Sequence, residues 1–356
     1  MKRNMKLLIS LLLLVTVMPS CIYDEEPQDI DLTDGIRMGF TIRTAGDTST
    51  RGKGAPTENG SALENKIDIE NRDFRVYFYE TDNNNNYIGE LEVMMVNRLE
   101  EEGKYYVVGK IAGDNMESLP ENFRVVVMAN LEKWEGYPKQ PAYGTNSNAY
   151  SYSGNGYCVS EDKLIPMWGC RTYTGVTSQK GVVTQLEAPV DMLRAFAKIE
   201  VIDATTDSDL RLTEVSLKGH STQFYIQPHE SGYTNGNTNA DFGQCNIPNE
   251  SSDTQTALKF TEDKDTSTEG TDTKKKFVLY VPEYTTTGSS IPMILTVKFG
   301  NDVEKDIYLS EEPSKISTLL RNHIYRFNVS LKKGELSIFY QGIPWEKKTE
   351  INIESG

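Results

Sequence analysis

The chain has 356 residues, of which 37% are hydrophobic and 10% aromatic, so it can form packed cores in one large or, as we favour, two ordinary domains. Its 37 lysine and arginine residues are outnumbered by 52 aspartate and glutamate residues, which gives a formal net charge of −15. This charge argues against a partner held through its phosphate backbone, and we expect no binding of nucleic acid.

The beginning of the chain has the pattern of an export signal. Three cations precede an apolar run at residues 7–18 that is too short to span a bilayer. The small residue before Cys21 resembles a bacterial lipobox, in which residues 1–20 are removed and Cys21 is acylated, although Met18 and Pro19 depart from the usual pattern. An ordinary cleaved signal with an incidental cysteine is the alternative. Lipid chains on Cys21 would hold this end in a membrane and leave the rest of the chain in water.

Residues 35–43 have the strict alternation of a half-buried β-strand. The apolar positions, which would share one face, are Ile36, Met38, Phe40 and Ile42. Residues 44–56, which include Arg51, are rich in Gly, Ser, Thr, Asp and Pro and predict an exposed loop that a protease can cut. Removal of the strand would leave an apolar groove and unpaired sheet edges for another segment to fill. The alternative is that it is simply the first strand of a sandwich.

Short runs of β-forming residues continue along the rest of the sequence, without a long amphipathic helix. We expect strands at residues 74–79, 87–96, 105–111, 123–129, 182–186, 193–202, 210–218, 224–226, 276–282, 291–299, 306–309, 324–331, 336–340 and 349–353. Many short strands separated by turn residues predict an all-β chain of antiparallel sandwiches. We place a domain boundary near residue 190, so that an acidic tether at 21–34 leads into domains at 35–189 and 190–356.

The long segment at residues 130–159 is rich in Gly, Tyr, Asn and Ser. If its tyrosines are exposed, they could contact a sugar or a partner protein, although a loop packed on itself is the commoner arrangement. The tyrosines concerned are Tyr137, Tyr143, Tyr150, Tyr152 and Tyr157.

The sequence offers little for catalysis or for a metal or other cofactor, and we expect none of the three. It contains no HExxH, GxSxG, P-loop or GxGxxG motif at a suitable strand–helix junction, and its three histidines are scattered. The acidic and amide residues at 82–86 lack the glycine and the final acid of a calcium-binding EF-hand loop. Cys158 and Cys170 could close a short loop by a disulfide, with free buried thiols as the alternative.

Several short motifs occur in an order that resembles the fimbrillin family, the lipoprotein-precursor pilins of the type V pili of Bacteroidetes. They are Glu-Asn-Lys-Ile at 64–67 with Val-Tyr-Phe at 76–78, Ile-Pro-Met-Trp-Gly at 165–169, Arg-Ala-Phe-Ala-Lys-Ile at 194–199, Leu-Tyr-Val-Pro-Glu at 279–283, Arg-Asn-His-Ile-Tyr-Arg-Phe-Asn at 321–328 and Pro-Trp at 344–345. Each motif alone is weak, but together they cover nearly the whole chain after the signal. The acidic residues at 24–26 resemble the export signal of surface lipoproteins in the same bacteria.

This resemblance implies a fold and an assembly mechanism. The fold would be two transthyretin-like antiparallel β-sandwich domains in tandem. An arginine-specific protease would cut the loop after the first strand, after Arg51 or, as second choice, after Arg43. The strand would then leave, and a C-terminal segment of a neighbouring subunit, within residues 336–353, would enter the groove by donor-strand exchange. The alternating apolar residues of that region are Leu336, Ile338 and Tyr340, or Ile351 and Ile353.

The resemblance also implies partners and a location. The partners would be other fimbrial subunits, of the same or an accessory kind, together with the outer membrane through the lipid of the precursor, and a host or bacterial surface ligand if the fimbria adheres. The chain would lie on the cell surface, in the outer membrane or in the fimbria. A subunit that keeps its first strand and lipid as an anchor, and a surface lipoprotein that binds glycan or host protein, are the alternatives.

Overall fold

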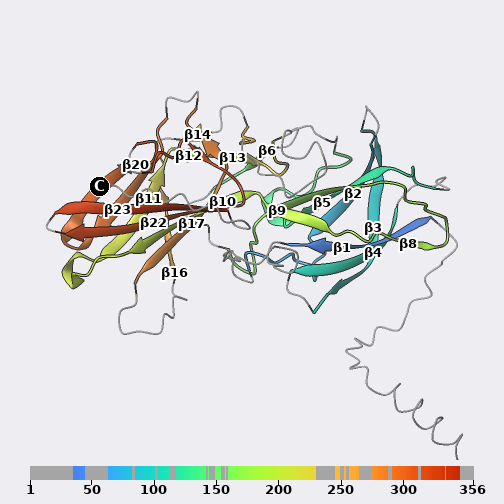
Figure 1. Ribbon diagram of the computed structural model, residues 1–356, viewed down its shortest axis with the longest axis horizontal. Helices are drawn as coiled ribbons and strands as arrows, with labels where there is room; N and C mark the ends of the chain where they lie inside the picture. The colour runs from blue at the N-terminus through green and yellow to red at the C-terminus, as the bar shows by residue number, and fades with distance from the viewer. Residues whose placement is uncertain are drawn as a thin grey trace, which may run out of the picture. The chain divides into compact units, whose positions relative to one another are not determined.

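The computed structural model describes residues 35–44, 63–81, 85–100, 103–111, 118–141, 143, 149–153, 157, 159–229, 245–248, 252–253, 256–263, 274–287, 291–311, 314–332 and 334–344. In these ranges the regular elements are strands (Figure 1), apart from the short 3₁₀ helices η1 (Glu132–Trp134), η2 (Ser208–Leu210) and η4 (Gly300–Asp302). The all-β fold expected from the sequence is therefore confirmed. No helix in the described ranges is long and apolar enough to cross a membrane.

The N-terminal strands close into a barrel. They are β1 (Ile36–Arg43), β2 (Phe74–Glu80), β3 (Tyr87–Arg98), β4 (Lys104–Ile111), β5 (Phe123–Ala129), β7 (Met167–Tyr173), β8 (Val183–Gln185) and β9 (Val190–Arg194). Their order is β4-β3-β2-β5-β7-β9-β1-β8, and β1 pairs with β4 as well, so all of them except β8 form a closed ring. The sequence predicts an antiparallel sandwich here, and the structure differs because β1 bridges the two ends of the sheet. β1 runs antiparallel to β4 but parallel to β8 and β9.

The C-terminal strands form two larger sheets. The five-stranded sheet contains β16 (Thr261–Asp263), β17 (Lys276–Pro282), β10 (Phe196–Asp203), β22 (His323–Lys332) and β23 (Glu335–Pro344), in that order. The four-stranded sheet contains β15 (Leu258–Lys259), β11 (Leu212–Lys218), β19 (Ile294–Phe299) and β20 (Val303–Tyr308), in that order. β10 and β22 are parallel, again unlike the antiparallel arrangement expected. Both sheets contribute to one cluster of buried apolar residues, as two packed layers require.

Three two-stranded ribbons complete the strands. They pair β12 (His220–Ser221) with β14 (Ser252–Asp253), β13 (Gln223–Tyr225) with β6 (Ala149–Ser151), and β18 (Tyr284–Thr285) with β21 (Thr318–Leu319). The single strand expected at residues 193–202 is two strands, because the backbone leaves the N-terminal sheet after Arg194 and Ala195 N donates to Pro166 O. The sheets thus change at Ala195, whereas the domain boundary near residue 190 stays a prediction.

Two strands of the barrel are apolar on both faces. Val76 and Phe78 of β2 belong to the cluster that fills the barrel, whereas Tyr77 and Tyr79 belong to the cluster of the C-terminal sheets. All seven residues of β5 are buried. A run of mainly apolar residues is typical of a strand covered on both sides, and it explains why the two clusters meet across β2 and β5.

Candidate functional site

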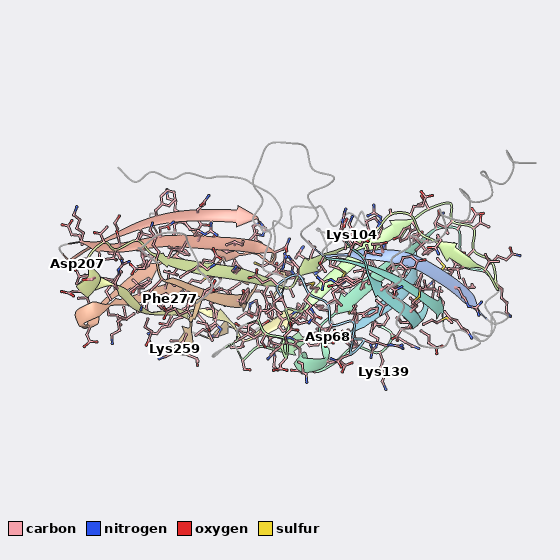
Figure 2. The ribbon with its side chains drawn as sticks, turned by 90° about the horizontal axis from the view of Figure 1, so that it is seen from below. Asp68, Lys104, Lys139, Asp207, Lys259 and Phe277 are labelled. Carbon is pink, nitrogen blue, oxygen red and sulfur yellow. The ribbon has the colours of Figure 1, made fainter. Side chains whose placement is uncertain are left out.

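The strand that closes the barrel is the one that the alternation at residues 35–43 predicts. β1 pairs with β4 over eight residues, from Ile36 opposite Ile111 to Arg43 opposite Lys104, which is labelled in Figure 2. On its other side β1 pairs with β8 at residues 37–39 and with β9 at residues 42–43. The four predicted apolar side chains, those of Ile36, Met38, Phe40 and Ile42, are each at most 1% exposed and belong to the cluster that fills the barrel.

The outer face of β1 is covered as well. Tyr106 of β4 donates from its hydroxyl to Oε1 of Gln185 of β8 over 2.8 Å, and Gly39 of β1 lies buried beneath this bond. The sequence analysis missed this contact. A glycine inside a strand often marks a close approach of neighbouring groups, and Gly39 was the available signal.

Of the two predicted cleavage positions, the structure describes only Arg43. Its guanidinium donates to Asp191 of β9, and Arg171 of β7 lies 3.7 Å from the same carboxylate. The side chain of Arg43 is only 19% exposed. Arg51 and the rest of residues 45–62 lie outside the described residues, as does Cys21.

The C-terminal candidate strand is an edge strand in the described part of the chain. β23 pairs along its whole length with β22 and ends the five-stranded sheet. Leu336, Ile338 and Tyr340 are half-buried against the C-terminal cluster, while Phe339 on the other face is 42% exposed. The second candidate pair, Ile351 and Ile353, lies outside the described residues.

The motifs that carry the sequence resemblance converge in one buried polar network. Glu64, in a turn before β2, binds Lys198 of β10 with 2.9 Å between Oε1 and Nζ and accepts a hydrogen bond from the Tyr280 hydroxyl of β17. Arg194 donates to the Glu64 carbonyl over 3.0 Å, to the Asn65 side chain, and to Asn322 Oδ1 over 2.9 Å. The sequence motifs named these residues, but their contact across the fold was not predicted.

The charges of this network support one another. Burial alone would raise the pKa of Glu64, but the adjacent Lys198 ammonium and its hydrogen bond bring it below the usual value. Burial likewise opposes ionisation of Glu200, yet Lys198 at 2.9 Å and Arg326 lower the pKa of Glu200 to about 2. Both carboxylates are therefore ionised at neutral pH, and Glu64 holds the turn at residues 63–65 on β10 through Lys198.

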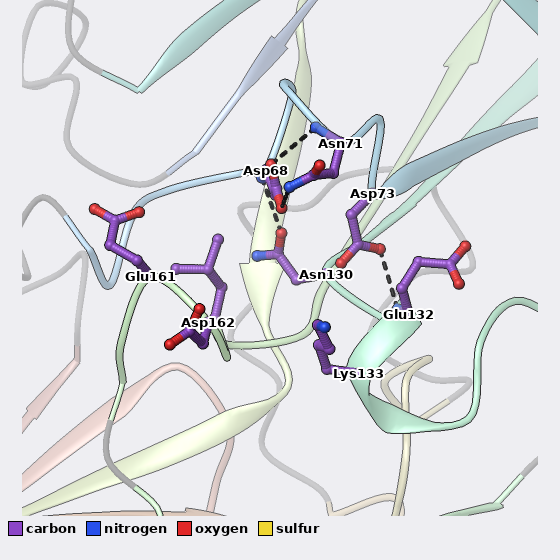
Figure 3. A pocket seen from close by; sticks show the side chains of 9 residues that line it. Asp68, Asn71, Asp73, Asn130, Glu132, Lys133, Glu161 and Asp162 are labelled. Carbon is purple, nitrogen blue, oxygen red and sulfur yellow. Dashed lines mark hydrogen bonds between the residues drawn. The ribbon is translucent and has the colours of Figure 1, made fainter.

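A small acidic pocket lies beside that turn (Figure 3). It has a volume of about 280 Å³ and is lined by Asp68, Asn71, Asp73, Asn130, Glu132, Lys133, Glu161, Asp162 and Leu164. Asp73 accepts hydrogen bonds from the backbone N–H groups of Leu131 and Glu132, and Asp68 accepts two from Asn71. No group of three or more acids, histidines or cysteines among the described residues could hold a metal ion. Through these hydrogen bonds Asp68 and Asp73 fix the loops that line the pocket.

Two further expectations concern side chains that turn out to be buried. Cys170 is a free, buried thiol 3.9 Å from the Tyr143 hydroxyl, and its possible disulfide partner Cys158 lies outside the described residues. Burial raises the pKa of Cys170 to about 12. The tyrosines of residues 130–159 are not exposed, because Tyr150, Tyr152 and Tyr157 are at most 6% exposed and pack around Trp134 and its neighbours.

Solved structures with a similar fold include two fimbrial proteins. The tip fimbrial protein Mfa3 from Porphyromonas gingivalis, with a C-terminal truncation, matches with a TM-score of 0.53 at 11% identity, over 87% of this chain and 99% of that one. A fimbrial assembly protein from Parabacteroides distasonis matches with a TM-score of 0.51 at 15% identity, over 88% and 98%. No protein-family model and no curated protein matches the sequence. The expected resemblance is thus confirmed at the level of the fold.

Proposed function

We propose that this chain is a structural subunit of a cell-surface fimbria, and that subunits join when a strand of one copy replaces β1 of the next. The single observation that carries the proposal is the position of β1, which closes the barrel and supplies four buried apolar side chains to it. The two fimbrial proteins that share the fold support a place in a fimbria. The role is structural and adhesive rather than catalytic, and the partners are other fimbrial subunits.

Loss of β1 would leave a groove of the right size for one strand. Neighbouring strands lie about 4.8 Å apart, so the edges of β4 and β9 would stand about 10 Å from each other. The groove would expose the surface that now buries Ile36, Met38, Phe40 and Ile42, at a loss of roughly 1.5–3 kcal/mol per side chain. A protein with that much uncovered apolar surface and two unpaired edges would bind a replacement strand strongly.

We infer that cleavage follows Arg51 rather than Arg43. A protease must draw the arginine side chain into its specificity pocket and extend the backbone around it. Arg43 sits within the β1–β4 ladder, and its guanidinium is held by Asp191. Arg51 instead belongs to the Gly-, Ser- and Thr-rich residues 44–56, whose composition favours an accessible loop.

Cleavage at Arg51 would release the membrane anchor together with the strand. Cys21, if it carries lipid, lies on the same side of the cut as β1, so the precursor would be held at the outer membrane and the cut subunit would be free to join the fimbria. The incoming strand would come from residues 336–353 of a neighbour. A subunit that resists cleavage would keep its lipid and act as an anchor.

A limited digest tests this function. The chain from residue 22 onward, with a tag in place of the signal, is treated with an arginine-specific protease and followed by intact mass and by gel electrophoresis without boiling. The expected result is one cut after Arg51 and a ladder of oligomers that boiling dissolves. A cut without oligomers, under conditions where the protein stays folded, would contradict assembly by strand replacement. Protection of Arg51 would favour the anchor.

A further inference from the structure

The register of the replacement strand can be read from the surroundings of β1, on the premise of the strand exchange proposed above. We propose that residues 339–346 of a second copy take the place of residues 36–43, in the same chain direction, with Gly342 in the position of Gly39. Three features of the groove support this register: the position of Gly39, the inward face and the position of Thr41. It differs from the two registers in which Leu336, Ile338 and Tyr340, or Ile351 and Ile353, point into the barrel.

The first position is the one beneath the Tyr106–Gln185 bond. A Cβ atom on Gly39 would lie 2.7 Å from the Tyr106 hydroxyl and 2.6 Å from Gln185 Oε1, so a side chain there would displace the ends of these two flexible side chains and break the hydrogen bond between β4 and β8. A replacement strand that preserves the link needs glycine at this point. Between residues 335 and 356 the sequence has glycine at 342 and 356, and placing Gly356 there would bring the polar Ser355 into the position of Met38.

The second feature is the inward face. With Gly342 in place of Gly39, the positions of Ile36, Met38, Phe40 and Ile42 pass to Phe339, Gln341, Ile343 and Trp345, in that order. Three of these four are large and apolar. Gln341 has about the length of the methionine it replaces but carries an amide, and a buried amide without partners costs about 1–3 kcal/mol. This register therefore fills the groove with one identifiable weak point.

The third position is that of Thr41, where the sheet can accept a proline. Pro344 would take the place of Thr41, and proline is tolerated in a sheet only where no ladder partner needs its N–H. Leu186 N donates to Gly39 O, so the backbone polar groups of Gly39, and by alternation those of Thr41, face β8 and β9. In the described chain the β8 pairing ends at Gly39 and the β9 pairing begins at Ile42, which leaves Thr41 at the interruption.

The same proline selects the chain direction. If the strand entered in reverse with Gly342 still beneath the Tyr106–Gln185 bond, Pro344 would fall at the position of Arg37. That position is paired with Val183 of β8. The reversed strand would lose a ladder bond there, so the direction of β1 is favoured.

The position of Arg43 changes the sign of a charge without selecting the register. Arg43 lies opposite Lys104 of β4, and Glu346 in its place would face Lys104 with the opposite charge. Arg43 is also paired with Asp191 of β9 and binds its carboxylate, so Glu346 would remove this ion pair and place two carboxylates side by side. The gain on the β4 side is therefore offset by the loss on the β9 side.

The present surroundings of residues 339–344 are compatible with transfer. β23 has one neighbouring strand, β22, and Phe339 faces solvent with 42% of its surface exposed. In the position of β1 the segment would have neighbours on both sides and Phe339 would be buried. The strand would give up its ladder with β22 and the contact of Tyr340 with Phe327, and would gain pairing on two sides and the burial of Phe339.

Disulfide trapping tests the register. The backbone N–H and C=O groups of Gly39 and of the other odd-numbered residues of β1 face away from β4. These residues therefore form the non-hydrogen-bonded pairs of the β1–β4 ladder. The Cα atoms of such pairs lie about 4.5 Å apart, which is within disulfide range. Tyr340 takes the position of Arg37, which is opposite Lys110. We expect the variant with Lys110→Cys and Tyr340→Cys to form a covalent ladder on non-reducing gels after cleavage, unlike the variant with Lys110→Cys alone.

Two matched variants keep this test decisive. Lys110→Cys with Ser337→Cys reports the register in which Leu336, Ile338 and Tyr340 point inward, and Lys110→Cys with Glu350→Cys reports the register of Ile351 and Ile353. A covalent ladder from either of these, and none from the Tyr340 pair, overturns the inference. Boil-sensitive oligomers of the unmodified chain with no disulfide in the Tyr340 pair overturn it as well. Absence of oligomers from the cut, unmodified chain would instead refute strand exchange itself.

A rescue experiment probes the glycine directly. Gly342→Val should reduce the yield of oligomers severalfold, because the valine side chain would displace the Tyr106 hydroxyl and the Gln185 amide of the next subunit and break their hydrogen bond. Combining it with Tyr106→Ala and Gln185→Gly should restore them. Gly356→Val is the control in the same region and should assemble normally. Normal assembly of Gly342→Val, or failure of the combined variant while Tyr106→Ala with Gln185→Gly alone assembles, would contradict the register.

Discussion

The ammonium of Lys198 lies 2.9 Å from the carboxylate of Glu64, and this buried ion pair joins the turn before β2 to the central strand of the five-stranded sheet. Glu64 is 1% exposed, and the Tyr280 hydroxyl donates to the same carboxylate. Because residues 45–62 precede this turn, a cut after Arg51 would leave a new chain end close to Glu64 in sequence. The ion pair therefore lies where it can keep the remaining chain folded once β1 is gone.

Glu64→Gln should lower the free energy of unfolding by about 1–3 kcal/mol, since a buried cation loses one of its charged partners while Glu200 remains. Urea denaturation measures the change. Glu161→Gln is the matched control, because Glu161 is 66% exposed in its ion pair with Lys66 and should contribute less than about 1 kcal/mol. Equal effects of the two substitutions would argue against a stabilising role for the buried network.

The stability of the protein should fall in acid in a range that Glu200 determines. Its folded pKa of about 2 lies below the ordinary value of 4.5, so its contribution is fully present above pH 4.5 and is lost as the pH falls towards 2. The loss should reach about 3 kcal/mol. Denaturation at several pH values should therefore show a shallower acid slope for Glu200→Gln than for the unmodified chain. Parallel slopes would contradict this assignment.

Phe40→Asp should prevent stable folding of the precursor, because it places a charge in the barrel where Phe40 is 1% exposed. Phe40→Leu, which keeps the site apolar, should fold with a moderate loss of stability. Thr41→Asp, on the half-buried outer face, is the positional control. Thermal melting of the purified chains measures all three, and a normal yield and melting temperature of Phe40→Asp would exclude β1 as a required part of the core.

Gln341→Met should strengthen the assembled state, because the register proposed here buries this side chain in the position of Met38. The temperature at which the oligomer ladder dissolves should rise, while the melting temperature of the uncut chain stays close to that of the parent. Gln341→Asn, which keeps the amide, serves as the control. A lower dissolution temperature for Gln341→Met would place residue 341 on the outer face and contradict the register.

Arg51→Gln should abolish the cut that leads to assembly. Arg43→Gln should leave this cut unchanged, although it should weaken the binding of β1 to β9 because Arg43 forms an ion pair with Asp191. Intact mass after digestion with an arginine-specific protease distinguishes the two. Cleavage of Arg51→Gln after Arg43, at the rate of the parent, would show that the ordered arginine is the substrate after all.

The sequence predicts strands from the local alternation of apolar residues, but it does not predict which strands pair when they lie far apart along the chain. Alternation at residues 35–43 identifies β1 and its four core residues, because a strand buried on one face must alternate. The same pattern is silent about partners, so the closure of the barrel by β1 between β4 and β9 was not predicted and a sandwich was expected instead.

The polar residues of the buried network were likewise visible in the sequence, while their contacts were not. The motif residues Glu64, Arg194 and Lys198 stand out in the sequence, but only the fold brings the turn at 63–65 onto β10. Composition left two alternatives open at residues 130–159, and the packed one holds for Tyr150, Tyr152 and Tyr157, which are buried near Trp134. Aromatic side chains have both an apolar ring and a polar tip, so their presence in a Gly- and Asn-rich segment does not indicate exposure.

The central claim is that a strand from another copy takes the place of β1, and following the released segment tests it most directly. A chain tagged at residue 22 carries the tag on the same fragment as β1, so the cut products can be separated by size and their tag content measured by mass. Cut monomers should retain residues 22–51 by non-covalent pairing, whereas oligomers should have lost them in proportion to the number of joined subunits. Oligomers that keep one tagged β1 fragment per subunit would contradict strand replacement.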